Sequence, residues 1–342
     1  MKKSVIAIWI LIFLEVTIFA QNKNNNSVRF FAAGDFNVAH WITPILEKRG
    51  VEFPFKYIKD YLFSADLVFV NLEAPFCNDG VPFEKNFVFK VPESHVNTLK
   101  AGNINLVSLA NNHILDYRMP CLETTVQLLK KEKIQFAGAG NTFAEAQKPA
   151  VFEINGIQFA FFAYSMTLPK YFFATDSSGG TAYPEYKVMR DSISKYDKMV
   201  DFVLVSFHWG QELTDIPKDY QQKYAHWAID FGADIILGHH PHVLQGIERY
   251  KNKFIFYSLA NFVFASYSNK AVESIIIDLN FTKNGIENIS IVPINVNNYN
   301  VYFQPKIIDS SKKIKIIDYI NSVSGELNNK QKILAENGKI IH

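Results

Sequence analysis

Short polar clusters, rich in histidine, carboxylate and amide side chains, stand directly after several apolar runs of this sequence. The densest cluster is Gly238-His239-His240-Pro241-His242, which places three imidazoles within four residues. Side-chain packing rarely calls for such a run at the end of a buried strand, so the cluster indicates metal binding. Equivalent positions after the other runs hold candidate partners, namely Asp35, Asn71, Glu73, Asn112, His113, His208 and Trp209.

A mixture of carboxylate and imidazole ligands suits Zn, Mn or Fe, whereas an all-oxygen set would favour Mg or Ca. We expect two divalent ions, with Glu73 as a bridging ligand, Asp35 on one ion and Asn112 on the other. Two ions held roughly 3.5–4 Å apart activate a bridging water and neutralise charge during an in-line displacement. His113 is then expected to stay off the metal and to protonate the leaving group. The chemistry that this set predicts is hydrolysis.

Each of these residues also has a structural interpretation, which the sequence leaves open. Asp35 after Gly34 is typical of a turn, and Asn112 can cap a helix or form a turn. Asn71 can pin the backbone of its own loop, and His208 can be a hydrogen-bonded histidine of the core. The prediction of a metal site therefore depends on these side chains meeting in one pocket.

The apolar runs predict the strands that would bring the clusters together. Their continuous hydrophobicity indicates strands buried on both faces of parallel sheets, and they alternate with helix-like segments at 120–133 and 219–231. The carboxyl ends of such strands meet at one edge of an open α/β sheet, where ligands bind. Over 271–294 the pattern changes to an antiparallel hairpin around the Lys-Asn-Gly turn at 283–285. The predicted strands are 28–33, 65–70, 104–110, 157–165, 201–207, 233–238 and 254–260.

Composition limits the class of protein. The chain has 342 residues, 48% of them hydrophobic, so it can bury a large core without a structural metal. A formal net charge of +2 and the lack of a Lys/Arg stripe argue against a nucleic-acid partner. No linker follows residue 27, so one domain is expected over 28–307, with a peripheral helix and tail over 308–342. Cys77 and Cys121 leave open whether a single disulfide forms.

The N-terminus has the pattern of a secretory signal. Lys2 and Lys3 precede an apolar stretch from Val5 to Ala20, and a polar run occupies residues 21–27. This predicts a signal peptide over 1–20, a linker over 21–27, and export to the periplasm or the cell surface. The alternative is an uncleaved anchor, which would be the protein's one contact with a membrane, although Glu15 argues against a stable span.

The motifs together carry a family resemblance. The strings GD, ADLVFVNLE, VSLANNHILDY, VSFHWG, GHHPHVLQGIE and YSLANFVF occur in this order over about residues 29–264. They resemble the CapA family of bacterial capsule and poly-γ-glutamate synthesis proteins, which is similar in fold to the calcineurin-like metallophosphoesterases. The resemblance implies a four-layer α/β sandwich, with two mixed β-sheets flanked by helices. It also implies a role in making, exporting or anchoring an extracellular polymer.

The resemblance assigns roles to individual residues. Asp35 matches the first-strand aspartate, Glu73 stands where phosphoesterases place a bridging aspartate, and Asn112-His113 matches an Asn-His pair. His208, His240 and His242 match the later histidine ligands, while His239, Asn71 and Trp209 are expected behind the ligands or against the substrate. The chain departs from the pattern at two positions: Asn37 stands where phosphoesterases have a histidine, and Ala260 stands where the family usually has glycine.

The first hypothesis is an exported metal-dependent hydrolase in capsule or envelope biogenesis, acting on a phosphoester or on the amide bonds of a polymer such as poly-γ-glutamate. The second is a non-catalytic subunit of a polymer synthesis or export complex that keeps a degenerate metal site. Both imply an envelope polymer or phosphoester as ligand, and other capsule-synthesis subunits as partners. A cytoplasmic nucleotide phosphoesterase is disfavoured by the predicted signal peptide.

Overall fold

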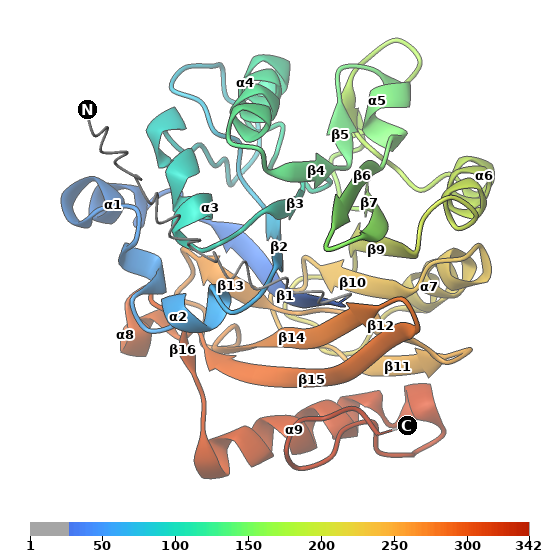
Figure 1. Cartoon of the computed structure of the whole chain (residues 1–342). Helices are drawn as coiled ribbons and strands as arrows, with labels where there is room; N and C mark the ends of the chain where they lie inside the picture. The colour runs from blue at the N-terminus through green and yellow to red at the C-terminus, as the bar shows by residue number, and fades with distance from the viewer. Residues whose placement is uncertain (1–26, 342) are drawn as a thin grey trace, which may run out of the picture.

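The computed structural model describes residues 27–341, so the predicted signal peptide and all of the predicted linker except Ser27 lie outside the described residues. Two β-sheets lie face to face at the centre, and helices cover their outer faces (Figure 1). This is the four-layer α/β sandwich that the resemblance implied, and the fold prediction is confirmed.

The larger sheet has eight strands in the order β16-β15-β14-β1-β2-β3-β4, and β13 pairs with the last residues of β1. Strands β13, β1, β2, β3 and β4 are parallel, whereas β14, β15 and β16 extend the sheet antiparallel. The predicted hairpin over 271–294 is confirmed as β14 and β15. The bounds are β1 Ser27–Asn37, β2 Leu67–Leu72, β3 Leu106–Ser108, β4 Gln135–Ala137, β13 Asn261–Phe264, β14 Glu273–Thr282, β15 Gly285–Asn295 and β16 Lys306–Ile307.

The smaller sheet has six strands in the order β11-β12-β10-β9-β7-β6. Its central strands are parallel, while β6 and β11 are antiparallel edge strands. Both main sheets are therefore mixed, as predicted. The bounds are β6 Ala150–Ile154, β7 Ile157–Ser165, β9 Phe202–His208, β10 Ile235–His239, β11 Ile247–Tyr250 and β12 Lys253–Phe256, and a separate pair is formed by β5 Ala139–Gly140 and β8 Gly180–Thr181.

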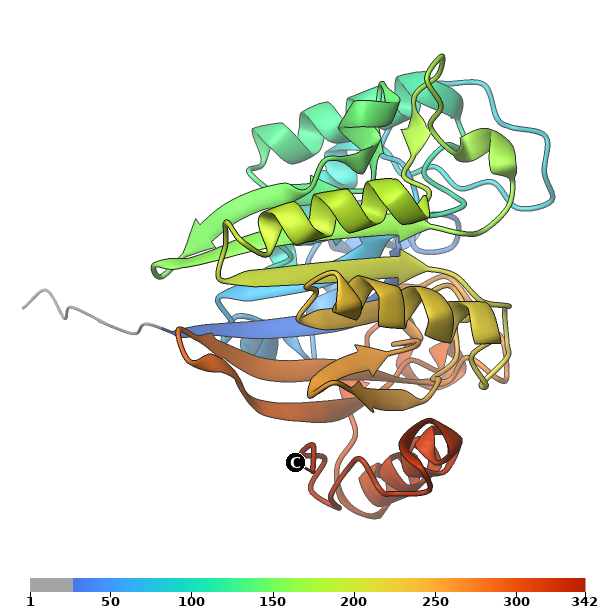
Figure 2. The same ribbon diagram turned by 90° about the vertical axis from the view of Figure 1, so that its right-hand side faces the viewer.

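Helices pack on the outside of each sheet. Helices α1 to α4 cover the larger sheet (Figure 1), and α6 and α7 lie across the outer face of the smaller one (Figure 2). The two helices expected at 120–133 and 219–231 are α4 and α7. The bounds are α1 Thr43–Arg49, α2 Lys59–Leu62, α3 Asn97–Ala101, α4 Arg118–Lys131, α5 Phe143–Gln147, α6 Tyr186–Tyr196, α7 Asp219–Asp230, α8 Asn298–Val301 and α9 Ser310–Ser324.

Three apolar cores separate the four layers. Because successive side chains of a strand point to opposite faces, neighbouring residues of β1 enter different cores. Phe30 packs between the sheets with Phe69 of β2 and Phe161 of β7, whereas Phe31 packs under the helices of the larger sheet. The continuous apolar runs are thus explained by burial of both faces of each strand.

The segment after residue 307 adds side chains to the core between the sheets. Ile316, Ile317 and Ile320 of α9 belong to that core, and α9 lies below both sheets in the two views (Figures 1 and 2). The domain boundaries themselves stay a prediction. Within residues 27–341, no helix combines the length and the apolar character that crossing a lipid bilayer requires.

A disulfide joins Cys77 to Cys121, which answers the question that the sequence left open. Cys77 lies in the loop after β2 and Cys121 in the first turns of α4. The bond closes a loop across a sequence separation of 44 residues. It therefore ties the long connection between β2 and β3 to a helix of the outer layer.

We expect replacement of both cysteines by alanine to lower the free energy of unfolding by about 4 kcal/mol, because the unfolded chain loses a constraint on a long loop. Urea denaturation of the parent and of the double variant, each with and without reductant, measures this. A loss that is equal in the parent and the variant when reductant is added would contradict the assignment.

Candidate metal centre

The predicted site residues come from the carboxyl ends of strands in both sheets. Asp35 is near the end of β1, Glu73 follows β2, and His208 and His239 are the last residues of β9 and β10. Asp35 pairs in register with Asn71 of β2, and His208 pairs with His239. Parallel pairing therefore places these polar residues at matching heights along the two sheets.

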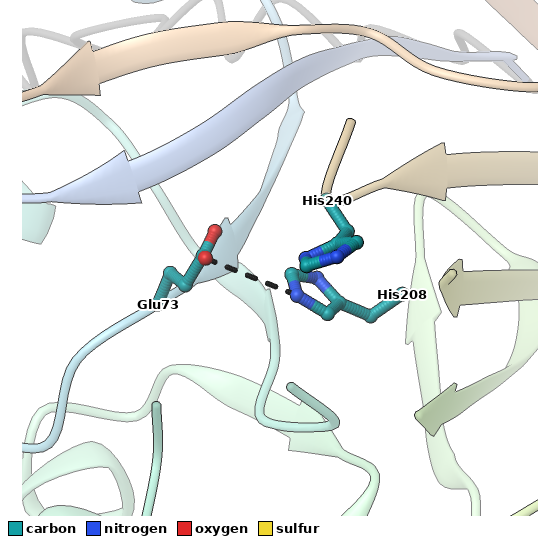
Figure 3. Close-up of side chains that lie close together, drawn as sticks. All are labelled: Glu73, His208 and His240. Carbon is teal, nitrogen blue, oxygen red and sulfur yellow. Dashed lines mark ion pairs between the residues drawn. The ribbon is translucent and has the colours of Figure 1, made fainter. Parts of the chain in front are cut away.

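One group of donors consists of Glu73, His208 and His240, whose ligand atoms lie within 4.8 Å of one another (Figure 3). Glu73 Oε1 lies 3.8 Å from His208 Nε2, and the two imidazole rings have centroids 4.8 Å apart. Asn112 Oδ1 lies 2.8 Å from the same His208 nitrogen. All three members of the group are buried.

A second group consists of Asp35, Glu73 and His242. His242 Nδ1 lies 3.2 Å from Asp35 Oδ2, and His242 Nε2 lies 3.9 Å from Glu73 Oε1. Glu73 belongs to both groups, which is the position a bridging carboxylate requires. The structure thus brings all six predicted ligands into one cluster.

His113 lies beside the cluster and outside both donor groups. Its Nε2 is 4.0 Å from Glu73 Oε1, and its Nδ1 is 2.7 Å from Asp116 Oδ2. The buried Asp116 carboxylate also accepts the backbone N–H of Phe89 and pairs with Lys85. A carboxylate at Nδ1 places the ring proton there, which leaves Nε2 facing the donor cluster.

Asn71 and His239 support the carboxylates. The Asn71 amide donates to Asp35 Oδ1 at 2.9 Å and to Glu73 Oε2 at 3.2 Å. His239 Nδ1 lies 3.2 Å from Asp35 Oδ1. Trp209 is not brought into the cluster, because it follows His208 and points to the opposite face of the sheet, where its Nε1 donates to the Tyr257 carbonyl and its ring stacks on Phe207.

Three residues at the site were missed by sequence reasoning. Asn261 lies opposite Asp35 in the β1–β13 register, and its Oδ1 is 2.9 Å from His242 Nδ1. Asp116 follows His113 by three residues, a spacing that the sequence displayed. Glu212 contributes a carboxylate oxygen to a third donor group with His240 and His242, and no strand-end signal marked it.

The backbone at the site is crowded and strained. A Cβ on Gly34 would fall 1.8 Å from the Ala260 carbonyl oxygen, so only glycine lets β1 approach this segment so closely. Ala260 has φ +61°, a left-handed conformation that favours glycine, the residue that the family resemblance implied for this position. His240 and His242 also have positive φ, at 94° and 58°. Such non-glycine residues cluster at functional sites.

Burial and neighbouring charges shift the pKa values of the site residues in different directions. Burial alone would raise the pKa of Asp35, but contacts with His239 and His242 hold it well below its usual value. Burial and the Asp35 charge raise the pKa of Glu73 well above its usual value. Burial opposes protonation of His242, yet Glu73 and Asp35 raise its pKa to about 10, whereas burial and His242 lower the pKa of His240 to about 3.

Several buried polar atoms of the cluster lack a hydrogen-bond partner among the residues that the structure describes. They include Glu73 Oε1, His240 Nδ1 and His239 Nε2. Buried polar atoms are nearly always paired, so each unpaired one requires an explanation. Coordination of a cation would satisfy Glu73 Oε1 and His240 Nδ1, and the mixed carboxylate, amide and imidazole set is compatible with a divalent metal.

Comparison with known proteins agrees with this geometry. The sequence model of the family described as "Bacterial capsule synthesis protein PGA_cap" matches residues 29–266. The chain belongs to this family. The matched range contains every residue of the donor groups, and the resemblance drawn from the motifs is confirmed.

Two relatives and one solved structure illustrate the similarity. The PGA biosynthesis protein CapA of Bacillus subtilis (strain 168) is 32% identical over 271 residues, which cover 77% of this chain and 70% of the relative. The capsule biosynthesis protein CapA of Bacillus anthracis is 29% identical over 284 residues, covering 81% and 69%. A hypothetical protein from Thermus thermophilus shares the fold, with a TM-score of 0.50, 16% identity, and coverage of 78% of this chain and 99% of that chain.

We expect binding of a divalent metal at neutral pH to release protons, on the order of two per cluster, since Glu73 and His242 must deprotonate to act as ligands. Because both groups have raised pKa values, metal affinity should rise as pH rises from about 6 to 9. Titration calorimetry in buffers of different ionisation enthalpy measures the release. A heat that is independent of the buffer would refute the assignment.

Proposed function

We propose that this chain is a metal-dependent hydrolase that cleaves a phosphoester, or an amide bond of an envelope polymer, during capsule or polyglutamate biosynthesis. The observation that carries the proposal is the buried Glu73 carboxylate, which is shared by two donor groups and keeps an unpaired oxygen. The proposal comprises two ions, each of Zn, Mn or Fe.

The residues that would hold the ions fall into the two groups described. Glu73, Asn112, His208 and His240 would hold one ion, and Asp35, Glu73 and His242 would hold the other. Bound divalent ions lower the pKa of water and polarise the bond to be cleaved. Asn71 keeps the two carboxylates in place through hydrogen bonds to both.

His113 is proposed as the general acid. Asp116 fixes its ring through Nδ1, so that Nε2 points toward the cluster. Burial lowers the pKa of His113, which makes its doubly protonated form a stronger acid, and that form would deliver the Nε2 proton to the leaving group. His113 belongs to neither donor group, as expected for a residue that carries a proton and does not bind the metal. Lys85, paired with Asp116, neutralises that carboxylate.

The polymer assignment and the location rest on other observations. The relatives from the two Bacillus species are named for PGA and capsule biosynthesis, so an envelope polymer as substrate and other capsule-synthesis subunits as partners are proposed for this chain. Export through the N-terminal signal is also proposed. The Cys77–Cys121 disulfide supports it, because such bonds persist in oxidising compartments.

A non-catalytic subunit with a degenerate metal site is the second candidate, and Asn37 favours it. Asn37 stands where phosphoesterases have a histidine, and its side chain bonds the Glu73 carbonyl and the Ala39 N–H. It is therefore engaged with the backbone and supplies no imidazole.

Joint replacement of His240 and His242 by alanine is expected to abolish near-stoichiometric metal content, since each donor group loses an imidazole. Elemental analysis of purified protein measures this, with His226→Ala as the control, because His226 lies on α7 and pairs with Glu248. Unchanged metal in the double variant would sink the assignment.

His113→Ala is expected to keep its metal and to lose turnover by about 10²–10⁴-fold, the usual contribution of a general acid. A panel of phosphoesters and γ-glutamyl polymers provides the assay. Loss of metal would instead make His113 a ligand. A parent protein that binds metal and turns over nothing in the panel would favour the non-catalytic subunit.

A further inference from the structure

One of the two proposed ions is short of a donor. The group formed by Asp35, Glu73 and His242 offers three ligand atoms, and Asn37, the residue at the place of a fourth, is engaged elsewhere. Its Nδ2 donates to the Glu73 carbonyl at 3.1 Å, and its Oδ1 accepts the Ala39 N–H at 2.9 Å. A ligand for this ion must therefore come from another part of the chain.

Glu212 is the carboxylate that lies within reach. One of its oxygens and one nitrogen from each of His240 and His242 all lie within 4.8 Å of one another. Glu212 is exposed, whereas Glu73 is fully buried, so the two carboxylates approach the imidazoles from the solvent side and from the interior. Glu212 belongs to the loop between β9 and α7.

The Glu212 loop is fixed to the loop that carries the histidines. The Leu213 N–H donates to the Pro241 carbonyl at 2.8 Å, which joins the residue after Glu212 to the residue between the two imidazoles. The Gln245 side chain donates to the Thr214 carbonyl at 2.7 Å. The position of Glu212 is thus set by backbone contacts on its C-terminal side.

The His240 imidazole, which belongs both to this group and to the group of Glu73 and His208, leaves a buried nitrogen at the centre unpaired within the described part of the chain. His240 is 8% exposed, and its Nδ1 has no hydrogen-bond partner within residues 27–341. His240 and His242 also hold strained left-handed backbone conformations, and their ring centroids lie 6.0 Å apart. A carboxylate beside two such imidazoles forms a donor set typical of a transition-metal site.

We infer that Glu212 is a further ligand of the metal centre. It acts beside His242 on the ion that Asn37 leaves short of a donor, and it lies next to His240 of the other ion's group. The inference rests on the proposed metal-dependent function and extends it. Glu212 lies outside the ligand pattern that the sequence motifs carry, and it gives the centre one carboxylate that solvent can reach.

The test measures the binding of Mn²⁺ to the full chain. Calorimetry and the electron paramagnetic resonance signal of free Mn²⁺ are the two readouts. Glu212→Gln is expected to raise the dissociation constant of the weaker ion at least about tenfold, since even residues that only orient a ligand cost roughly 10–100-fold. Glu185→Gln, the same change at an exposed position before α6, is the matched control and should equal the parent. A dissociation constant of Glu212→Gln within about twofold of the parent would overturn the inference.

A second variant separates coordination from simple charge. Glu212→Asp keeps the negative charge but is shorter by one methylene, so a ligand at 212 would lose contact while a distant charge would act almost unchanged. We expect Glu212→Asp to weaken Mn²⁺ binding nearly as much as Glu212→Gln, and at high salt as well as low salt. Parent-like binding by Glu212→Asp would exclude coordination.

These results are distinct from a failure of the proposed function. A parent chain that binds Mn²⁺ and hydrolyses its substrate, with Glu212→Gln unchanged in binding, would overturn the ligand role and leave the hydrolase proposal in place. A parent chain that binds none of Mn²⁺, Zn²⁺ or Fe²⁺ would overturn both.

Discussion

The close burial of two carboxyl groups is the constraint on which the rest of the structure depends. Asp35 and Glu73 are both fully buried, and Asn71 bridges them through hydrogen bonds to each. Two adjacent buried carboxylates cannot both stay ionised without compensating positive charge. Accordingly, the pKa of Asp35 is lowered, the pKa of Glu73 is raised, and the pKa of His242 beside them is raised as well. The same arrangement suits a divalent cation, because the ion supplies the positive charge that the buried carboxylates require.

The sandwich supplies this arrangement because its two sheets pack face to face, with the carboxyl ends of their parallel strands along the same edge. The carboxylates and Asn112 come from the larger sheet, whereas His208, His240 and His242 come from the smaller one or the loop that follows it. Both donor groups that contain Glu73 draw their ligands from the two sheets together. The aromatic core between the sheets, built from residues such as Phe30, Phe69 and Phe161, therefore sets the distance between carboxylates and imidazoles. The strained backbone at Ala260 and at the two histidines is held by this surrounding structure.

The proposed hydrolase and its alternative differ in what the site does with its second ion position. Asn37 is engaged with the backbone, which weakens that position, while Glu212 offers a carboxylate from the opposite side. His113, oriented by Asp116, stands beside the donors without joining them. A site that only stabilised the fold would have no need of an oriented imidazole that binds no metal. The oriented His113 therefore supports the proposed hydrolase over the non-catalytic alternative.

The sequence alone determined the α/β class and the strand-end position of most donors, because these follow from local patterns. Continuous apolar runs require burial on both faces, and polar residues after parallel strands meet at one edge, so a polar cluster at the strand ends could be predicted. The four-layer sandwich, and the choice of His240 and His242 over His239 as ligands, were implied by the family resemblance of the motifs. The alternation of side chains along a strand also indicates that Trp209, the residue after His208, lies on the face opposite the cluster. Only the tertiary structure decided the pairing of Cys77 with Cys121, the contact of Asn261 with His242, and the approach of Glu212, since these depend on how separate loops pack. Contacts between loops are set by the three-dimensional arrangement of the sheets, and no spacing along the chain encodes them.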